Sequence, residues 1–377
     1  MSSLDYIAIL GRQPELGLIE LESLLGPGHV SRFGRQAALT GPRLEIDRLG
    51  GTVKLGTIIY RGPVTPLQQL PFDLGPLPMR ETKTPFALSV YGGRETPRSV
   101  LAAGLVLKKQ LRNRGPVRLV SPQRGTEVSA AELKHNRVLD DGFELMAVFA
   151  GNEMVIARTT GVQDIDWYSK RDYGRPARSA KVGMLPPKLA QVLVNTTSAP
   201  VVADPFCGTG VVLQEALLLG REAHGTDLAP DMVAASRENL PWLEREAGTP
   251  LPAWSVAEAD ARTVTLPENC AVVSEGYLGP NLTHSPAPAE LAKIRAELLE
   301  LYRSALANFA RQLPPGGEVS LCVPAWRVGK QWQYLGLVDE LPDLGYTLKG
   351  FEAAPSPLLY SRVDQMVGRQ LFTLRKL

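Results

Sequence analysis

Three acidic residues in the C-terminal half of the chain, Asp204, Asp227 and Asp260, each follow a short apolar segment. The first opens the run Asp204-Pro-Phe-Cys-Gly208-Thr-Gly210, which follows Val201-Val202-Ala203. Two glycines at a strand end predict a tight turn into a helix, with backbone N–H groups at the helix start facing a ligand. Asp204 would face an ammonium group and the N–H groups a carboxylate. This combination suits a zwitterionic ligand such as S-adenosylmethionine.

Other glycine-rich nucleotide sites fit less well. A phosphate loop requires a Lys-Ser/Thr pair after the glycines, and a dinucleotide fingerprint requires a third glycine three residues beyond the second. The segment has neither. Asp227 ends the next predicted strand, 223–227, where a carboxylate can hold the two ribose hydroxyls. Asp260 follows the predicted strand 254–258 and suits the adenine amino group.

A lone Asp in such a position is more often a helix N-cap or a solvated loop end. Three acids in series, each closing a predicted strand, favour one shared site instead. Ligands of open α/β sheets bind beyond the carboxyl ends of the strands, so the fourth strand of the series should deliver the reactive group. That strand is predicted at 271–274 and is followed by Glu275, Gly276 and Tyr277.

The elements that must position these residues alternate between strands and helices. Apolar periodicity predicts strands at 201–204, 223–227, 254–258, 271–274 and 318–323, and helices at 211–219, 230–246 and 288–313. This rhythm predicts an α/β fold with a doubly wound, mostly parallel sheet. Segments 358–360 and 370–374 predict an antiparallel hairpin that closes the sheet edge.

The N-terminal half divides into two small α/β units. The first has a strand at 6–10, a helix that begins at Pro14 and ends at Gly26, and strands at 53–55 and 57–60. A proline-rich stretch, 63–78, predicts a linker. The second has strands at 86–91, 117–120, 143–149 and 154–158 and a helix at 99–113. Residues 167–187 predict a loop that closes before a helix at 188–195.

Composition narrows the class of protein. The chain has 377 residues, which suggests about two or three domains. Apolar residues make up 44% and charged residues 21%, as in globular proteins. No apolar run reaches the roughly 20 residues of a membrane helix, and the N-terminus lacks a signal pattern, so we expect a cytoplasmic protein. Three separated cysteines and four histidines predict neither a disulfide framework nor a metal site.

Basic residues are concentrated although the net charge is only +2. Such a run is often only a solvated surface, but beside a methyl-donor domain it favours a platform for the phosphates of a nucleic acid. The candidate RNA-binding residues are Arg94, Arg98, Lys108, Lys109, Arg112, Arg114, Arg124 and Lys134, with Arg171 and Arg175 in the predicted loop.

Motif by motif, the chain resembles RNA methyltransferases that join a THUMP-containing N-terminal region to a Rossmann-like class I methyltransferase domain. It is most similar to the archaeal and eukaryotic group that N2-methylates guanosine at tRNA position 10. The segments that carry the resemblance are residues 6–25, 170–176 (Lys-Arg-Asp-Tyr-Gly-Arg-Pro), 183–189 (Gly-Met-Leu-Pro-Pro-Lys-Leu), 204–210 and 360–369.

The resemblance implies a ferredoxin-like domain at 1–78, a THUMP RNA-binding domain at 79–160, a linker at 161–187 and the methyltransferase domain at 188–377. It implies that the N-terminal modules grip the tRNA acceptor end and set which nucleotide reaches the pocket. We expect a monomer with tRNA as its partner, and the sequence does not identify a protein partner. It also implies which residues surround S-adenosylmethionine: Met184, Leu185, Asp204, Phe206, Cys207, Gly208, Gly210, Asp227, Leu228, Asp260 and Ala261.

The catalytic segment departs from the family pattern. Family members carry Asp-Pro-Pro-Tyr, whose carboxylate and carbonyl accept hydrogen bonds from an exocyclic amine while the ring stacks on the flipped base. Here these positions hold Ser274, Glu275, Gly276 and Tyr277. Either Glu275 supplies the carboxylate, with Ser274 accepting a second hydrogen bond, or the site is degenerate.

The first hypothesis is therefore an S-adenosylmethionine-dependent enzyme that makes N2-methylguanosine, or another exocyclic-amine product, in tRNA, with Ser274, Glu275 and Tyr277 as catalytic residues. The second is a tRNA-binding protein without methyl transfer. Methylation of amines in DNA shares the chemistry but has no use for the N-terminal modules, and the basic residues disfavour a protein substrate.

Overall fold

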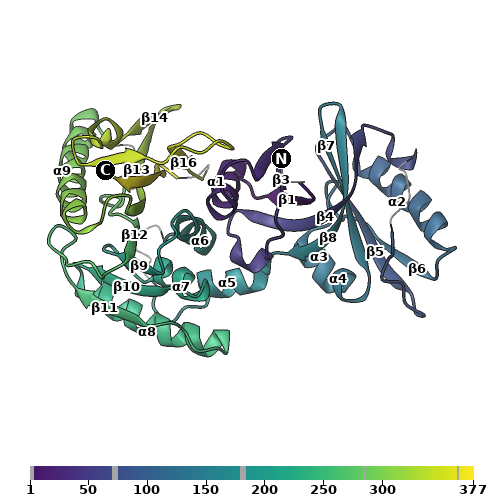
Figure 1. The fold of residues 1–377 in the computed structure, drawn as a ribbon, viewed down its shortest axis with the longest axis horizontal. Coiled ribbons are helices and arrows are strands. Elements are labelled where there is room, and N and C mark those ends of the chain that lie inside the picture. The colour runs from purple at the N-terminus through teal and green to yellow at the C-terminus, as the bar shows by residue number, and fades with distance from the viewer. Residues whose placement is uncertain (1–3, 70–74, 179–183, 283–285, 363–364) are drawn as a thin grey trace. The chain divides into compact units, whose positions relative to one another are not determined.

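The chain forms two compact units, Met1–Asp166 and Trp167–Leu377, shown in the computed structural model of Figure 1. The structure describes residues 4–69, 75–178, 184–282, 286–362 and 365–377. Lys181, Gly183 and positions 363–364 of the segments considered above lie outside these ranges. Each unit is built around its own sheet.

The N-terminal unit is α+β, with strand order β2-β3-β1-β4-β8-β7-β5-β6. Its strands are antiparallel neighbours except where β5 pairs in parallel with β6 and β7. The strands are β1 (Tyr6–Leu10), β2 (Val30–Phe33), β3 (Ala37–Thr40), β4 (Thr52–Pro63), β5 (Thr84–Tyr91), β6 (Val117–Val120), β7 (Phe143–Ala150) and β8 (Glu153–Val162). The helices are α1 (Pro14–Leu25), α2 (Pro97–Leu111), α3 (Ala130–His135) and α4 (Val138–Asp141), with 3-10 turns at Ile46–Arg48 and Leu67–Gln69.

Successive side chains of β5 pack against helices on opposite faces of this sheet. Phe86 and Leu88 belong to the core that includes Leu107 of α2, whereas Ala87 packs with Leu133 of α3 and Val138 of α4. Successive side chains of a strand point to opposite faces, so a wholly buried strand needs a helix on each side. Every residue of β5 is buried.

Three expectations for the N-terminal unit need correction. The segments predicted at 53–55 and 57–60 are one strand, β4, with register irregularities at Leu55/Gly56 and Ile58/Tyr60. Strands β2 and β3 were not predicted, because short strands leave little periodicity. Within the predicted linker 63–78, Leu67 is buried in the core of α2. The sheet contains strands from both predicted N-terminal modules, and their division at 78/79 stays a prediction.

The C-terminal unit has strand order β11-β10-β9-β12-β13-β17-β15, with β14 paired to β13 and β16 to β17. Its strands are β9 (Val201–Asp204), β10 (Glu222–Asp227), β11 (Trp254–Glu258), β12 (Cys270–Glu275), β13 (Glu318–Val328), β14 (Gln331–Tyr334), β15 (Tyr346–Leu348), β16 (Leu358–Tyr360) and β17 (Val367–Lys376). The helices are α5 (Ile165–Tyr173), which begins just before the boundary of the units, α6 (Pro187–Asn195), α7 (Val211–Leu218), α8 (Pro230–Ala247) and α9 (Pro288–Gln312), with a 3-10 turn at Leu337–Glu340.

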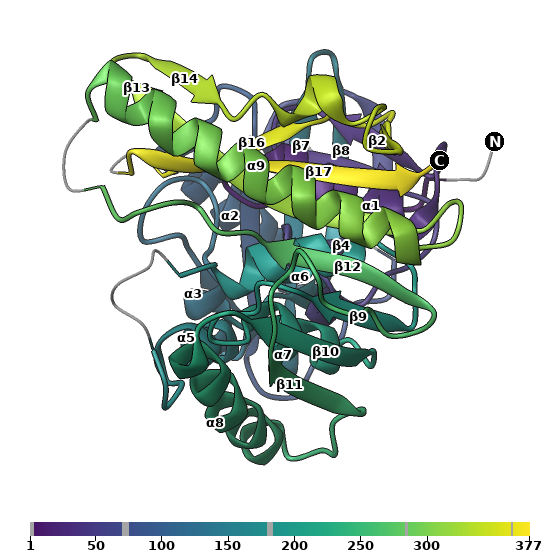
Figure 2. The ribbon, with the colours of Figure 1, turned by 90° about the vertical axis from the view of Figure 1, so that its left-hand side faces the viewer.

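Strands β9 to β13 pair in parallel along this order, which confirms the predicted doubly wound, mostly parallel sheet. Helix α9 covers one face and α6 and α7 the other (Figure 1), and Figure 2 shows α9 running across β13 and β17. The predicted hairpin exists as the antiparallel pair β16/β17. It does not close the edge, because β17 lies between β13 and the unpredicted strand β15.

The predicted loop 167–187 is wrong over its first part, where α5 continues to Tyr173. The helix has few apolar residues. Arg171 is nevertheless buried, where it lies over the rings of Trp167 and Tyr168 and pairs with Glu215 of α7. A helix held by a buried ion pair leaves no apolar stripe, so periodicity in the sequence could not show it.

Candidate active site

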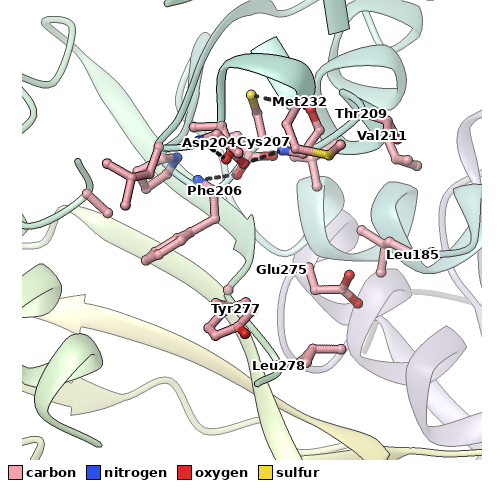
Figure 3. A pocket seen from close by; sticks show the side chains of 18 of the residues that line it. Leu185, Asp204, Phe206, Cys207, Thr209, Val211, Met232, Glu275, Tyr277 and Leu278 are labelled. Atoms are coloured by element: carbon pink, nitrogen blue, oxygen red, sulfur yellow. Dashed lines mark hydrogen bonds between the residues drawn. The ribbon is translucent and has the colours of Figure 1, made fainter. Parts of the chain in front are cut away.

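A cavity of about 590 Å³ opens beyond the carboxyl ends of β9, β10, β11 and β12 (Figure 3). Its volume falls in the range of about 300–1,000 Å³ typical of small-molecule sites. The predicted site residues that line it are Met184, Leu185, Asp204, Phe206, Cys207, Gly208, Asp227, Leu228, Asp260, Ala261, Glu275 and Tyr277. Two predicted residues, Gly210 and Ser274, do not belong to its lining.

The glycine turn has the backbone that the sequence predicted. Gly208 has φ +53° and Gly210 has φ +82°, values that L side chains rarely adopt. Its N–H groups are used differently from the expectation. The Phe206 N–H donates to the Asp204 carboxylate, and the Gly208 N–H donates to the Asp227 carboxylate. The Cys207 N–H donates to the Thr226 carbonyl, and the Gly210 N–H donates to the Cys207 carbonyl. These four donors are therefore taken up inside the protein and are not available to a ligand carboxylate.

Asp204 lies at the bottom of the cavity and is 2% exposed. Its Oδ1 accepts hydrogen bonds from the Ser274 hydroxyl at 2.6 Å and from the Phe206 N–H at 3.2 Å. Burial raises the pKa of Asp204 to about 7, although these two donors oppose the shift. The carboxylates of Asp227 and Glu275 raise it further. A cation bound in the cavity would restore the charged form.

Asp227 and Asp260 lie at the ends of β10 and β11. Asp227 accepts N–H bonds from Gly208 at 2.8 Å and from Ala229 at 2.9 Å, so it links the glycine turn to the start of α8. Asp260 accepts the Arg262 N–H at 2.9 Å and is paired with that guanidinium, which holds the pKa of Asp260 below its usual value. Both residues line the cavity.

Glu275 and Tyr277 lie side by side at the tip of β12 (Figure 3). The Glu275 carboxylate is paired with the buried guanidinium of Arg369 on β17. Burial raises the pKa of Glu275, and Arg369 opposes that shift. Tyr277 is 49% exposed and lines the cavity, so its side chain is accessible to a ligand.

Gly276, between these two residues, is required by crowding. A Cβ there would lie 2.4 Å from the Tyr302 hydroxyl oxygen. That hydroxyl donates to the Tyr277 carbonyl at 2.9 Å, and the Gly276 N–H donates to the Cys322 carbonyl at 3.1 Å. Helix α9 and strand β13 therefore fix the backbone of residues 275–277.

Ser274 does not have the position expected of a base-contacting residue. Its side chain is completely buried, and its hydroxyl donates to Asp204. The cause is strand alternation: Glu275 faces the cavity, so Ser274 points toward β9. This corrects the expectation that Ser274 contacts the base. Ser274 links β12 to Asp204 instead.

The predicted RNA-binding residues of the N-terminal unit are mostly exposed: Arg94, Arg98, Lys109, Arg112, Arg114, Arg124 and Lys134, with Lys108 half-buried. Lys134 pairs with Asp164 and Asp166, which reduces its availability to phosphates. Lys108 and Lys109 lie in the last turn of α2, where cations also stabilise the helix dipole. Their role toward RNA stays a prediction.

Arg171 and Arg175 are wrong as surface RNA-binding residues, because each is only 3% exposed. Arg171 makes a bidentate pair with Glu215, with distances of 2.8 and 3.2 Å. Arg175 contacts Thr209 and Met184, both of which line the cavity. A local charge count cannot separate a buried arginine from an exposed one.

Sequence reasoning missed Arg369 and Tyr302, which hold Glu275 and Tyr277. Arg369 stands in the tail segment that carried the family resemblance, but no spacing rule links it to Glu275. Most of the other unpredicted lining residues lie near predicted ones along the chain, whereas Leu301 comes from α9. The set consists of Pro205, Thr209, Val211, Val212, Ala229, Met232, Arg262, Gly276, Leu278 and Leu301.

The fold and the cavity define a class: a chain with a Rossmann-like α/β unit, which carries the cavity, and an N-terminal α+β unit. TrmN from Thermus thermophilus has the same fold, with a TM-score of 0.55, 20% identity and 99% of both chains covered. This confirms the predicted fold class. None of the helices in the described ranges is long and apolar enough to span a bilayer, and the described side chains form no group of three metal-ligating residues.

The sequence is similar to particular proteins over part of its length. It is 33% identical over 146 residues to the tRNA (guanine(10)-N2)-dimethyltransferase of Methanothermobacter thermautotrophicus, covering 38% of this chain and 39% of that one. It is 40% identical over 72 residues to the protein of the same name from Pyrococcus abyssi, covering 19% and 20%. The matched part is thus at most about two fifths of these relatives. No protein-family model matches the chain.

Proposed function

We propose that this protein is an S-adenosylmethionine-dependent tRNA methyltransferase that modifies the exocyclic N2 amine of guanosine, of the position-10 type. The observation that carries the proposal is the convergence of Asp204, Asp227 and Asp260 on one cavity, next to Glu275 and Tyr277. The names of the similar proteins supply the substrate class. Because tRNA is the proposed substrate, we also propose a cytoplasmic location.

The cavity residues fit the chemistry of S-adenosylmethionine. Asp204 is a buried carboxylate that becomes charged beside a cation, as the ammonium group requires. Asp227 offers a carboxylate to the ribose hydroxyls and Asp260 one to the adenine amine. Apolar side chains enclose the rest, namely Met184, Leu185, Phe206, Leu228 and Ala261. When bound, the cofactor supplies an electrophilic methyl group on sulfur.

On the acceptor side, Glu275 accepts a hydrogen bond from the guanine amine and Tyr277 stacks on the flipped base. The cofactor would supply the methyl group to this nitrogen and leave as the neutral thioether, and the methylated amine would then release its proton to solvent. Glu275 therefore has to orient the amine rather than act as a strong base. Its pairing with Arg369 gives the carboxylate one direction relative to the cavity.

Incubation of the purified chain with labelled donor and bulk tRNA, followed by digestion to nucleosides, tests this proposal. We expect labelled N2-methylguanosine, and Glu275→Gln should reduce it strongly while donor binding persists. Glu258→Gln, at the end of β11, outside the cavity lining, is the matched control and should leave the yield unchanged. Donor binding without any labelled nucleoside from tRNA would contradict the proposed activity.

One observation favours the second function, tRNA binding without methyl transfer. The carboxylate at the tip of β12 already has a cationic partner, and Ser274 is turned toward Asp204. Under this alternative the parent protein binds tRNA and donor but produces no labelled nucleoside. The same assay separates the two functions.

The proposed tRNA surface includes α2 and its C-terminal turn. Charge reversal of Lys108, Lys109 and Arg112 to Glu should weaken tRNA affinity and flatten its salt dependence. Each lost phosphate contact removes about 0.7 to 0.9 from the log–log salt slope. Filter binding at several salt concentrations measures the slope, with Lys293→Glu/Lys330→Glu, both exposed, as control. An unchanged slope would mean that these residues are only a solvated surface.

A further inference from the structure

Arg175, between α5 and α6, is a buried cation without a carboxylate partner among the described residues. It is 3% exposed. Its Nη1 is 3.3 Å from the Thr209 hydroxyl and its Nη2 3.5 Å from the Met184 sulfur, and its Nε has no acceptor. These contacts are long and their acceptors are uncharged. A guanidinium removed from water normally gains an anionic partner, because its desolvation is costly.

Arg171 in the same segment shows the usual solution. It is equally buried, but Glu215 accepts two of its hydrogen bonds. Glu215 and Asp172 influence Arg175 only through space, and burial lowers the pKa of Arg175 despite them. Arg369 is buried as well and pairs with Glu275, so Arg175 is the one of these three buried arginines that has no carboxylate partner among the described residues.

The position of Arg175 is fixed by the core of the unit. Asn239 of α8, which is fully buried, accepts the Ala177 N–H at 3.0 Å and donates to the Ala177 carbonyl at 2.9 Å. The same amide donates to the Thr209 carbonyl at 2.9 Å. One side chain thus ties the Arg175 segment to the glycine turn, so Arg175 is held against that turn.

The two side chains that Arg175 contacts, Thr209 and Met184, line the cavity. Figure 3 shows Thr209 on the same side as Val211 and Leu185, away from Asp204 and Phe206. The guanidinium therefore lies directly behind this wall. An anion at this end of the cavity lacks the turn N–H groups described above, which are already donated to protein acceptors.

We propose that Arg175 binds the carboxylate of the methionine moiety of the donor, and this assignment rests on the proposed function. Asp204 and Arg175 then receive the two charges of the amino-acid end, with the Thr209 hydroxyl beside the carboxylate. The anion supplies the partner that the buried guanidinium lacks. Arg175 is thus a cofactor-binding residue rather than a tRNA-binding one.

Calorimetry with S-adenosylhomocysteine and 5′-methylthioadenosine tests the assignment, because the second ligand keeps the adenosine and the thioether but lacks the amino-acid end. Arg175→Met should weaken S-adenosylhomocysteine binding roughly 10- to 100-fold, the cost of one charged hydrogen-bonded contact. The same substitution should change the affinity for methylthioadenosine by no more than about twofold. The affinity of Arg175→Lys for S-adenosylhomocysteine should lie between those of the unaltered protein and Arg175→Met. Arg178→Met, an exposed arginine of the same segment, is the control and should change neither affinity.

If Arg175→Met does not fold, the unaltered protein still tests the assignment. Decarboxylated S-adenosylmethionine should bind roughly 10- to 100-fold more weakly than S-adenosylmethionine. Equal affinities of the unaltered protein for S-adenosylmethionine and its decarboxylated form would overturn the assignment and leave the proposed function intact. The same holds if Arg175→Met loses affinity for S-adenosylhomocysteine and methylthioadenosine equally. Failure of the unaltered protein to bind any adenosyl ligand would overturn the proposed function and this assignment together.

Discussion

The donor side of the cavity, formed by Asp204, Asp227 and Asp260, differs from the acceptor side, formed by Glu275 to Tyr277, in the range of the contacts that hold it. Each donor-side acid accepts the N–H of the residue two positions later. The acceptor side is held from far along the chain, by Arg369, Tyr302 and the Cys322 carbonyl. Local turns build one side, and tertiary packing builds the other.

The difference has a chemical consequence. Asp204 uses Oδ1 for its hydrogen bonds within the protein, whereas both oxygens of Asp227 and of Asp260 have partners there. A carboxylate oxygen can accept a second hydrogen bond, so these contacts are compatible with a ligand. The Glu275 carboxylate instead depends on a cation from another strand for its charge and direction. The two sides should therefore respond differently to substitution and to pH.

The largest expected effect is on the donor side. Asp227→Ala removes the proposed ribose contact and leaves the Gly208 and Ala229 N–H groups without that acceptor. Affinity for S-adenosylhomocysteine should fall by more than about 100-fold. Calorimetry measures the change, and Asp231→Ala, on the exposed first turn of α8, is the control. A loss below about threefold would argue against a ribose contact.

The acceptor side should fail without loss of donor affinity. Arg369→Met leaves Glu275 buried without its cation, which raises the pKa of that carboxyl further. We expect kcat to drop roughly 10- to 100-fold and the activity profile to move to higher pH, since Glu275 must be ionised. Arg375→Met, exposed on the same strand, is the control. A uniform loss at every pH with an unshifted profile would mean that Arg369 does not act through the Glu275 charge.

Donor binding should depend on pH through Asp204. The ammonium group requires the ionised carboxylate, whose pKa in the ligand-free protein is about 7. Affinity should therefore rise about tenfold per pH unit below 7 and become constant above it. Asp204→Asn should abolish this dependence. The interval from about pH 5 to about pH 8 includes that pKa. A donor affinity of the unaltered protein that stays constant over this interval would contradict the proposed contact.

The same carboxyl affects folding in the opposite direction. Its pKa is higher in the folded chain than the ordinary value of 3.8, so its contribution to stability is fully present below 3.8 and is lost as pH rises toward about 7. Bound donor should offset this loss. Thermal unfolding with and without S-adenosylhomocysteine should therefore show a ligand effect that grows with pH.

The smallest expected effect concerns the backbone of the acceptor side. Gly276→Ala places a Cβ against Tyr302 and should cost about 1–3 kcal/mol of stability. The Tyr302 hydroxyl also donates a hydrogen bond to the Tyr277 carbonyl, so a displaced Tyr302 should lower kcat as well as stability. Gly350→Ala, with no atom near the added Cβ, is the control for denaturation and activity. Equal stabilities of the two variants would show that Tyr302 moves aside easily.

The sequence was informative wherever short-range chemistry decided the structure. The strand ends at Asp204 and Asp227, the positive φ at Gly208 and Gly210, and the alternation that makes a parallel sheet all depend on neighbouring residues. It was misleading for Arg171 and Arg175, because a charged side chain looks the same in a sequence whether it is exposed or buried. It was also insufficient for Ser274, whose direction depends on the face of β12 that meets the cavity.

From the sequence alone came the fold class, the donor-side acids and the departure of the catalytic segment from Asp-Pro-Pro-Tyr. Only the tertiary structure decided that Arg369 pairs with Glu275, that Tyr302 requires Gly276, and that Arg175 is buried behind Thr209. The physical reason is distance along the chain. Hydrogen bonds between near neighbours leave patterns in the sequence, whereas contacts between distant strands and helices exist only once the sheet has assembled.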